Sequence, residues 1–214
     1  MTRKELVTIA AGPAQLEGML ELPATPIGMV LFAHGSASSR HSPRNRLVAE
    51  RLRDAGIGTL LLDLLSPDED RRYENRFDIA LLTDRLGLAA SWLATEPLTA
   101  PLSLGLFGAS TGAAAALQLA ARDGSGIAAI VSRGGRPDLA GPAALAAVIA
   151  PTLLVVGGDD GVVVDLNSQA LSLLRCDKQL LVVPGATHLF EEPGKLEEVA
   201  QAASDWFVRH LGAS

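Results

Sequence analysis

Six short runs of mostly apolar residues recur along the chain, and they constrain its fold more than any other feature. The runs are Gly28–Ala33, Thr59–Leu62, Leu102–Phe107, Ile127–Val131, Thr152–Val156 and Gln179–Val183. They lack the alternation of apolar and polar residues that marks a strand with one wet face, so they predict strands buried on both faces. Helical segments separate most of them. Strand and helix in alternation predict a parallel sheet with helices on both faces.

The segments between the runs mostly have helical spacing. The expected helices are Pro43–Ala55, Ile79–Ala94, an alanine-rich helix ending before Gly124, Pro137–Ile149 with a break at Gly141-Pro142, Val163–Leu174 and Gly194–Leu211. Upstream of the first run, Leu6–Ala10 and Leu16–Leu22 flank Gly12-Pro13 and predict an antiparallel hairpin at a sheet edge. The polar segment Leu64–Asp78 predicts a charged loop with some helical turns. We expect one α/β domain over residues 1–214, because this length suits a single core.

Composition excludes several classes of protein. The formal net charge of −6 and the absence of a basic stripe argue against a nucleic-acid partner. No unbroken apolar run approaches the roughly 18 residues of a membrane span, and the first residues do not resemble a signal peptide. We therefore expect no membrane partner. The single cysteine, Cys176, allows no internal disulfide, so we expect a reducing, cytoplasmic setting. No metal-binding spacing occurs, and the sequence leaves a homodimer open.

Ser110 lies at the centre of Gly108-Ala109-Ser110-Thr111-Gly112, between an expected strand and an expected helix. Small neighbours allow a tight turn that lifts the Ser110 hydroxyl above the sheet, and the Thr111 N–H at the helix N-terminus faces developing negative charge. The same five-residue pattern arises by chance in chains rich in Gly and Ser, where the serine is a helix N-cap. The strand before it and the helix after it favour a catalytic nucleophile.

The ends of two later strands supply partners for this serine. Asp159 and Asp160 follow Thr152–Val156, and His188 follows Gln179–Val183. A serine hydroxyl needs an imidazole to accept its proton, and the imidazole needs a carboxylate to orient it. The order Ser, acid, His is that of α/β-hydrolases. Either aspartate fits the acid position on these grounds.

Three other histidines compete with His188 as the base. His210 falls in the last helix, where we expect a surface residue, and His41 falls in a polar loop, where we expect it to be solvated. His34 ends the first buried strand, beside the expected site. His188 is the best candidate, because its loop follows a strand in the position that the catalytic histidine takes.

Four fragments together resemble a known family. They are His34-Gly35-Ser36, Gly108–Gly112, Gly157-x-x-Asp160 and Gly185-x-x-His188. With them the chain resembles, over nearly its whole length, a small α/β-hydrolase of the dienelactone-hydrolase-like family. The resemblance implies the α/β-hydrolase fold, favours Asp160 over Asp159 as the acid, and implies that His34 shapes the oxyanion loop. Dienelactone hydrolases proper use a cysteine where this chain has Ser110, which moves the expected substrate towards ordinary esters.

The remaining site residues are expected around this centre. We expect the backbone amides of Ser36 and Thr111 to form the oxyanion hole, with His34 and Gly35 lining the substrate site. Arg133 follows the strand Ile127–Val131 and could bind a substrate carboxylate. The alternative for Arg133 and Arg136 is an exposed loop arginine paired with Asp138.

Access to the site is expected to depend on loops alone. The segment between residues 132 and 150 is too short for a lid domain, which leaves the loops 36–42 and 64–78 at the entrance. Asp63, at the end of another strand, is expected only to cap the following turn.

The sequence therefore predicts a serine hydrolase that acts on a small-molecule carboxylic ester, through a Ser110–His188–Asp160 triad and an acyl-enzyme, without cofactor or metal. Thioesterase, lactonase and acyltransferase activities are alternatives on the same triad. A small-ligand sensor on the same fold is an alternative from another functional class.

Overall fold

Eight strands form one sheet in the order β1-β2-β4-β3-β5-β6-β7-β8 in the computed structural model, which describes residues 2–36 and 38–212. The strands are β1 Arg3–Ala11, β2 Ala14–Leu22, β3 Gly28–Ala33, β4 Ile57–Leu62, β5 Leu104–Ala109, β6 Ile127–Arg133, β7 Thr152–Gly157 and β8 Lys178–Val183. The six strands β4-β3-β5-β6-β7-β8 run parallel to one another. The β1–β2 hairpin is antiparallel, and β2 pairs antiparallel with β4. This confirms the predicted α/β-hydrolase fold with an N-terminal hairpin.

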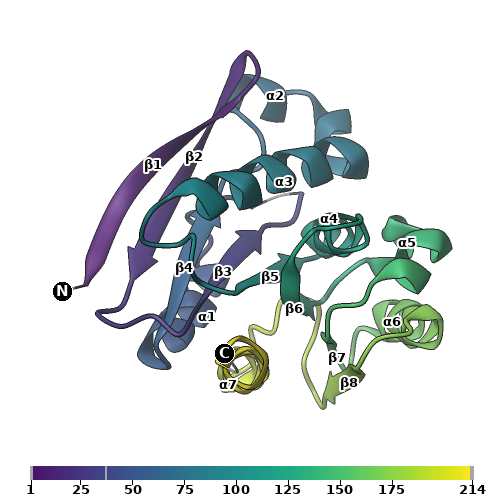
Figure 1. Cartoon of the computed structure of the whole chain (residues 1–214). Helices are drawn as coiled ribbons and strands as arrows, with labels where there is room; N and C mark the ends of the chain where they lie inside the picture. The colour runs from purple at the N-terminus through teal and green to yellow at the C-terminus, as the bar shows by residue number, and fades with distance from the viewer. Residues whose placement is uncertain (1, 37, 213–214) are drawn as a thin grey trace.

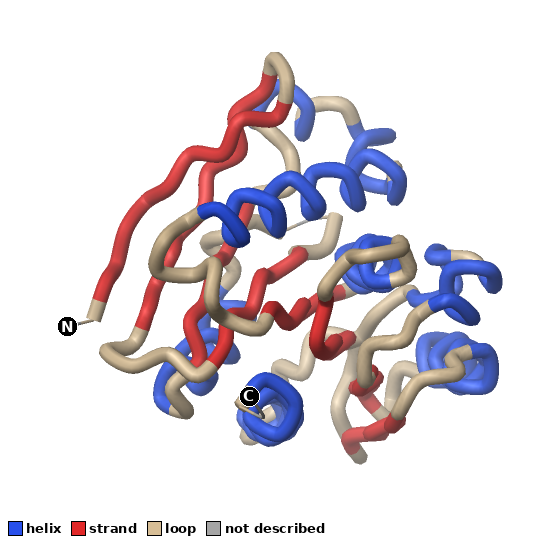
Figure 2. The backbone as a smooth tube through the Cα atoms, in the orientation of Figure 1, coloured by secondary structure: helices blue, strands red, loops and turns tan. Residues whose placement is uncertain are grey.

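The helices form one layer on each face of the sheet (Figures 1 and 2). The helical elements are α1 Pro43–Asp54, α2 Pro67–Asp70, the 3-10 turn η1 Tyr73–Phe77, α3 Ile79–Thr95, α4 Thr111–Ala120, the 3-10 turn η2 Pro137–Ala140, α5 Pro142–Ala147, α6 Gly161–Leu173 and α7 Lys195–Leu211. Side chains of α1 and α7 pack with one face of the sheet, and side chains of α3 to α6 pack with the other. Each face therefore has its own apolar core.

The central strands are buried because both faces are covered. Every residue of β3, β4 and β7 is buried, which explains why these strands have continuous apolar sequences. Phe32 of β3 and Phe107 of β5 pack ring to ring at 4.8 Å on the α1–α7 face. This burial fixes the carboxyl ends of the strands, where the candidate site residues lie.

Local sequence signals set the ends of several helices. The Ser42 hydroxyl accepts a hydrogen bond from the Asn45 N–H, and Pro43 occupies the first turn of α1. The predicted helix over residues 137–149 divides at Gly141, where φ is 84°. Among the residues that the structure describes, no helix is both long and apolar enough to cross a bilayer.

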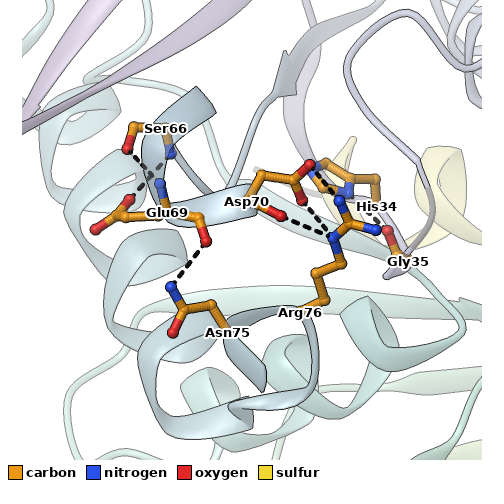
Figure 3. Close-up of polar contacts among 7 residues, drawn as sticks. All are labelled: His34, Gly35, Ser66, Glu69, Asp70, Asn75 and Arg76. Atoms are coloured by element: carbon orange, nitrogen blue, oxygen red, sulfur yellow. Dashed lines mark hydrogen bonds and ion pairs between the residues drawn. The ribbon is translucent and has the colours of Figure 1, made fainter. Parts of the chain in front are cut away.

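The charged segment between residues 64 and 78 is more ordered than a loop (Figure 3). Ser66 and Glu69 form a reciprocal capping box around α2. The Asn75 side chain donates to the Glu69 carbonyl at 2.8 Å, and Arg76 donates to the Asp70 carboxylate at 2.9 and 2.8 Å. The segment thus makes many of its own polar contacts.

Candidate active site

Ser110 occupies a tight turn between β5 and α4. Its backbone has φ 51° and ψ −122°, a conformation that residues other than glycine rarely adopt. A Cβ atom on Gly108 would lie 2.4 Å from the Cα of Ala113, and one on Gly112 would lie 2.2 Å from the Ala33 carbonyl oxygen. The two glycines therefore let α4 pack directly against the ends of β5 and β3.

The backbone around Ser110 contacts two neighbouring loops. The Ser110 N–H donates to the Arg133 carbonyl at 3.3 Å, and the Ser110 carbonyl accepts from the Arg136 N–H at 3.1 Å. On the other side, a Cβ atom on Gly35 would lie 3.0 Å from the Ser110 Cβ and 3.7 Å from its Oγ. The loop after β3, which carries the expected oxyanion donor Ser36, therefore lies against the serine.

His188 and Asp160 meet above the ends of β7 and β8. The Nδ1 of His188 lies 2.6 Å from an Asp160 carboxylate oxygen. The two loops touch through their backbones, because a Cβ on Gly157 would lie 2.3 Å from the Ala186 carbonyl oxygen. The Asp159 side chain is exposed, and its N–H donates to that same carbonyl at 3.0 Å. Of the two candidate acids, Asp160 is thus the one that contacts the imidazole.

The loop after β6 lies between Ser110 and His188. Gly134 adopts a φ of 50°, and a Cβ there would lie 3.5 Å from the His188 ring carbon Cε1. The backbone carbonyl of Arg133, one residue earlier, accepts a hydrogen bond from the Ser110 N–H. Within the described ranges, no hydrogen bond joins the Ser110 hydroxyl to the His188 ring; such contacts are commonly long before substrate binds.

His34 is held in one tautomer behind the oxyanion loop. Its Nε2 accepts a hydrogen bond from the Leu64 N–H at 3.1 Å, so the proton must be on Nδ1, which lies 2.8 Å from the Gly35 carbonyl oxygen. Figure 3 shows this imidazole against Gly35 and near Asp70. Burial lowers the pKa of His34, and the Gly35 contact, Asp63 and Asp70 oppose that effect only partly. The ring is therefore neutral at neutral pH.

This contact orients the next peptide. In a trans peptide the C=O and N–H point in opposite directions, so a Gly35 carbonyl turned towards His34 turns the Ser36 N–H away from it. Gly112 packs on the Ala33 and His34 carbonyls, which brings the start of α4, and with it Thr111, beside the same loop. The two expected oxyanion donors thus belong to adjoining backbone segments.

Asp63 anchors the loop between β3 and α1. Its carboxylate accepts the Arg40 backbone N–H at 2.6 Å and also pairs with the Arg40 guanidinium, which lies 2.7 Å from Glu17 of β2. The expectation that Asp63 only caps its own turn is therefore wrong. Ala37, within this loop, lies outside the described residues, and His41 is exposed as expected.

Arg133, the last residue of β6, and Arg136, in the loop after it, have different environments. Arg136 donates to both Asp138 carboxylate oxygens, at 2.9 and 2.7 Å, as the alternative interpretation proposed. Arg133 is instead only 7% exposed, and its Nε and Nη1 have no hydrogen-bond partner. Burial, together with nearby Arg44, lowers the pKa of Arg133 to about 10. The expectation of an exposed, Asp138-paired arginine is thus wrong for Arg133.

Several contributions were not found from the sequence. Arg40, Arg44 and the Leu64 amide had no signal, because each acts through a partner distant in sequence. His210, expected on the surface, has a side chain that is only 16% exposed and packs against Trp206, with ring centroids 4.6 Å apart and the rings tilted at 55°. The described residues contain no cluster of three or more His, Cys, Asp or Glu that could hold a metal ion.

A hollow of about 810 Å³ lies at the amino ends of the central strands, whereas Ser110 lies at their carboxyl ends. Residues of α3, the segment 121–126 and the start of β3 and β5 line it. Ligands in parallel α/β sheets bind at the carboxyl ends of the strands. We therefore place the candidate site at Ser110 and not in this hollow.

Comparison with known proteins places the geometry in context. The chain is 52% identical to a solved dienelactone hydrolase from Anabaena variabilis, with a TM-score of 0.94, over 98% of this chain and 99% of that one. XC6422 from Xanthomonas campestris, an α/β serine hydrolase without lid, is 23% identical with a TM-score of 0.80 over 99% and 96% of the two chains. At that identity the likeness concerns the fold alone. No family model matches the chain.

Two curated proteins of Mycobacterium tuberculosis are also similar, at 58% identity over 209 residues. Both carry the name "Putative phosphoribosyl transferase". The match covers 98% of this chain but 47% of each relative, so the chain spans about half the length of these relatives.

Proposed function

Because the chain belongs to the dienelactone hydrolase family of α/β-hydrolases, we propose that it is a serine hydrolase that cleaves small carboxylic esters. One observation carries the proposal. The His188 Nδ1 lies 2.6 Å from an Asp160 carboxylate oxygen, and Gly134 lies between this pair and the strained turn of Ser110. An acid, an imidazole and a serine in this arrangement can activate a hydroxyl for acyl transfer.

In the proposed reaction the Ser110 hydroxyl attacks the ester carbonyl while His188 Nε2 accepts its proton. Asp160 holds Nδ1–H, which fixes the tautomer and stabilises the imidazolium. The Ser36 and Thr111 amides stabilise the oxyanion of the tetrahedral intermediate. His188 then donates its proton to the leaving alcohol, and water, activated by the same imidazole, releases the acid from Ser110.

The serine hydroxyl depends on a neighbouring base for activation, whereas a cysteine is partly ionised on its own, and the Asp160–His188 pair supplies such a base. The hydrolase proposal concerns only the part that this chain spans. The name carried by the mycobacterial relatives describes proteins about twice as long as their match to this chain.

Hydrolysis of p-nitrophenyl esters of increasing acyl length tests the proposal. We expect turnover by the wild type and a loss of several orders of magnitude in kcat for Ser110→Ala, with an unchanged melting curve. Ser168→Ala, an exposed serine of α6, is the matched control and should behave like the wild type. An active Ser110→Ala protein would contradict the nucleophile assignment. Wild-type inactivity on esters, with turnover of thioesters or lactones, would place the activity in those alternative classes.

A further inference from the structure

We propose that Asn167, in the middle of α6, is a positioning residue for the nucleophile. Its side-chain amide binds one peptide of the loop after β6, and that peptide binds the turn of Ser110. Among the described residues, Asn167 forms no hydrogen bond with any member of the triad, so it acts through that peptide. The inference rests on the proposed hydrolase function and adds to it a residue on which the placement of Ser110 depends.

Asn167 is a polar side chain fully enclosed by the protein. It is 0% exposed, and its Nδ2 donates to the Gly135 carbonyl at 3.0 Å and to the Val163 carbonyl, one turn earlier in α6, at 2.8 Å. Carbonyl oxygens only accept hydrogen bonds, so the end of the amide that faces both of them must be the NH₂ group, which has two hydrogens to donate. The neighbours of Asn167 therefore fix the orientation of its amide.

The peptide that joins Gly135 to Arg136 carries the effect to the serine. Its carbonyl accepts from Asn167, and its N–H donates to the Ser110 carbonyl at 3.1 Å. In a trans peptide these two groups point in opposite directions, so Asn167 binds one side of the peptide and Ser110 binds the other. Hydrogen bonds in such a chain polarise one another, and loss of the first weakens the second.

The Gly135 carbonyl depends on Asn167 for its hydrogen bond. Gly135 is buried, and no other donor among the described residues binds this carbonyl. A buried carbonyl without a partner is costly, so without the Asn167 amide the peptide would turn or shift to find another donor. Such a movement would carry the Arg136 N–H away from Ser110.

The same contact relates the serine to the other two members of the triad. Asp160 is the N-cap residue of α6, the helix that carries Asn167. Gly134, directly before Gly135, lies against the His188 ring. The hydrogen bond from Asn167 to Gly135 therefore ties the helix that begins at the acid to the loop that contacts both the imidazole and the nucleophile turn.

Two variants of Asn167 test the proposal on p-nitrophenyl acetate. Asn167→Leu removes both donors with little change in side-chain volume. Asn167→Thr keeps a donor for the Val163 carbonyl, as threonine does within helices, but its side chain is too short to reach Gly135. For both we expect kcat to fall about 10- to 100-fold with KM within about twofold of the wild type, because a displaced nucleophile weakens the transition state and not the binding of the ester.

Ala170→Gly is the matched control for stability. Ala170 lies on the same helix and is 2% exposed, and glycine in its place destabilises α6 without touching the contact to Gly135. At a temperature where all the proteins are folded, this variant should keep the wild-type kcat and KM. An equal fall in kcat in Ala170→Gly would assign the effect to helix stability and overturn the proposal. Failure of both Asn167 variants to fold would do the same, since it would make Asn167 a structural residue only.

Amide hydrogen exchange tests the tie without any turnover. The Arg136 N–H is protected by its bond to the Ser110 carbonyl, and we expect it to exchange about tenfold faster or more in Asn167→Leu. The Gly134 N–H, which donates to the Val155 carbonyl at 2.8 Å, is the internal control and should keep its rate. An unchanged exchange rate at Arg136 would show that other contacts hold the peptide, and would overturn the proposal.

The positioning proposal and the hydrolase proposal fail in different ways. If the wild type and both Asn167 variants cleave the ester at the same rate, the positioning role is wrong and the hydrolase proposal stands. If the wild type cleaves no ester but exchange at Arg136 accelerates in Asn167→Leu, the hydrolase proposal is wrong and the tie between α6 and the Ser110 turn stands.

Discussion

The Nε2 of His34 accepts a hydrogen bond from the Leu64 backbone N–H at 3.1 Å, across 30 positions of sequence. The bond ties the loop after β3 to the loop after β4, and it fixes which ring nitrogen carries the proton. The other nitrogen, Nδ1, then donates to the Gly35 carbonyl at 2.8 Å and orients the peptide that presents the Ser36 amide. In the proposed mechanism, His34 would therefore act by orienting an oxyanion-hole amide and would exchange no proton with the substrate.

Replacing His34 with phenylalanine should lower kcat while leaving KM nearly unchanged. The variant loses both ring contacts, so the Ser36 amide is no longer aimed at the oxyanion, and we expect a loss of about 10- to 100-fold in kcat. Steady-state kinetics on a p-nitrophenyl ester measure it. His41→Gln, in the same loop but exposed, should retain wild-type kinetics. An unchanged kcat in His34→Phe would show that the peptide is held by other contacts.

His34 should also make stability depend on pH in the acid range. Its pKa in the folded protein is lowered, chiefly by burial, so the unfolded chain binds a proton at a higher pH than the folded protein does. The contribution of the neutral ring is fully present above the unfolded value of about 6.5 and is lost as pH falls from there towards the folded pKa. Urea titrations from pH 8 to pH 5 should show a steeper loss for the wild type than for His34→Phe. Parallel profiles for the two proteins would contradict this assignment.

Ser110→Gly should be more stable than the wild type and inactive. The backbone of Ser110, at φ 51° and ψ −122°, is accessible to glycine without strain, whereas such a conformation costs a residue with a Cβ about 1–3 kcal/mol. For a chain of this size each kcal/mol raises Tm by about 2–4 °C. Thermal melting of Ser110→Gly beside Ser110→Ala isolates the effect, since alanine keeps the Cβ. Equal melting temperatures for the two variants would show that the turn is not strained.

Gly112→Ala should destabilise the fold strongly, whereas Gly161→Ala should not. The new methyl group at position 112 would lie 2.2 Å from a backbone oxygen of β3, which forces α4 away from the sheet. We expect a loss of about 3 kcal/mol or more in the free energy of unfolding. A methyl group on Gly161, the first residue of α6, would meet nothing within 4 Å. Urea denaturation of the two variants provides the comparison, and equal stability would contradict the close packing of Gly112 against β3.

The fold could be predicted because its central strands are buried on both faces and therefore appear as continuous apolar runs. The largest error in a strand boundary falls at the exposed edge. The hairpin was predicted to begin at Leu6, but β1 begins at Arg3, since pairing with β2 keeps charged residues in the strand. Local polarity there gave no sign of the pairing partner.

The candidate site was predictable only where one residue or one spacing carries the signal. Ser110 sits in a recognisable turn, and Asp160 and His188 follow strand ends at characteristic spacings. The Arg40–Asp63 anchor and the His34–Leu64 bond join loops that are distant in sequence, so no local pattern announces them. Burial of Arg133 was missed for a related reason: an arginine at the end of a strand is usually solvated, and its burial depends on tertiary packing that no local pattern shows.

The segment between Ser66 and Asp78 closes many of its own polar contacts, through the Ser66–Glu69 capping box, the Asn75 amide and the Arg76–Asp70 pair (Figure 3). It borders His34, Gly35 and Ser36, yet it donates no side chain to the Asp160–His188 pair. Apart from the Glu69–Arg85 pair with α3, the segment depends little on other parts of the chain. We therefore expect that it can be exchanged as one unit, which would reshape the approach to Ser110 while the strands that carry Ser110, Asp160 and His188 keep their positions.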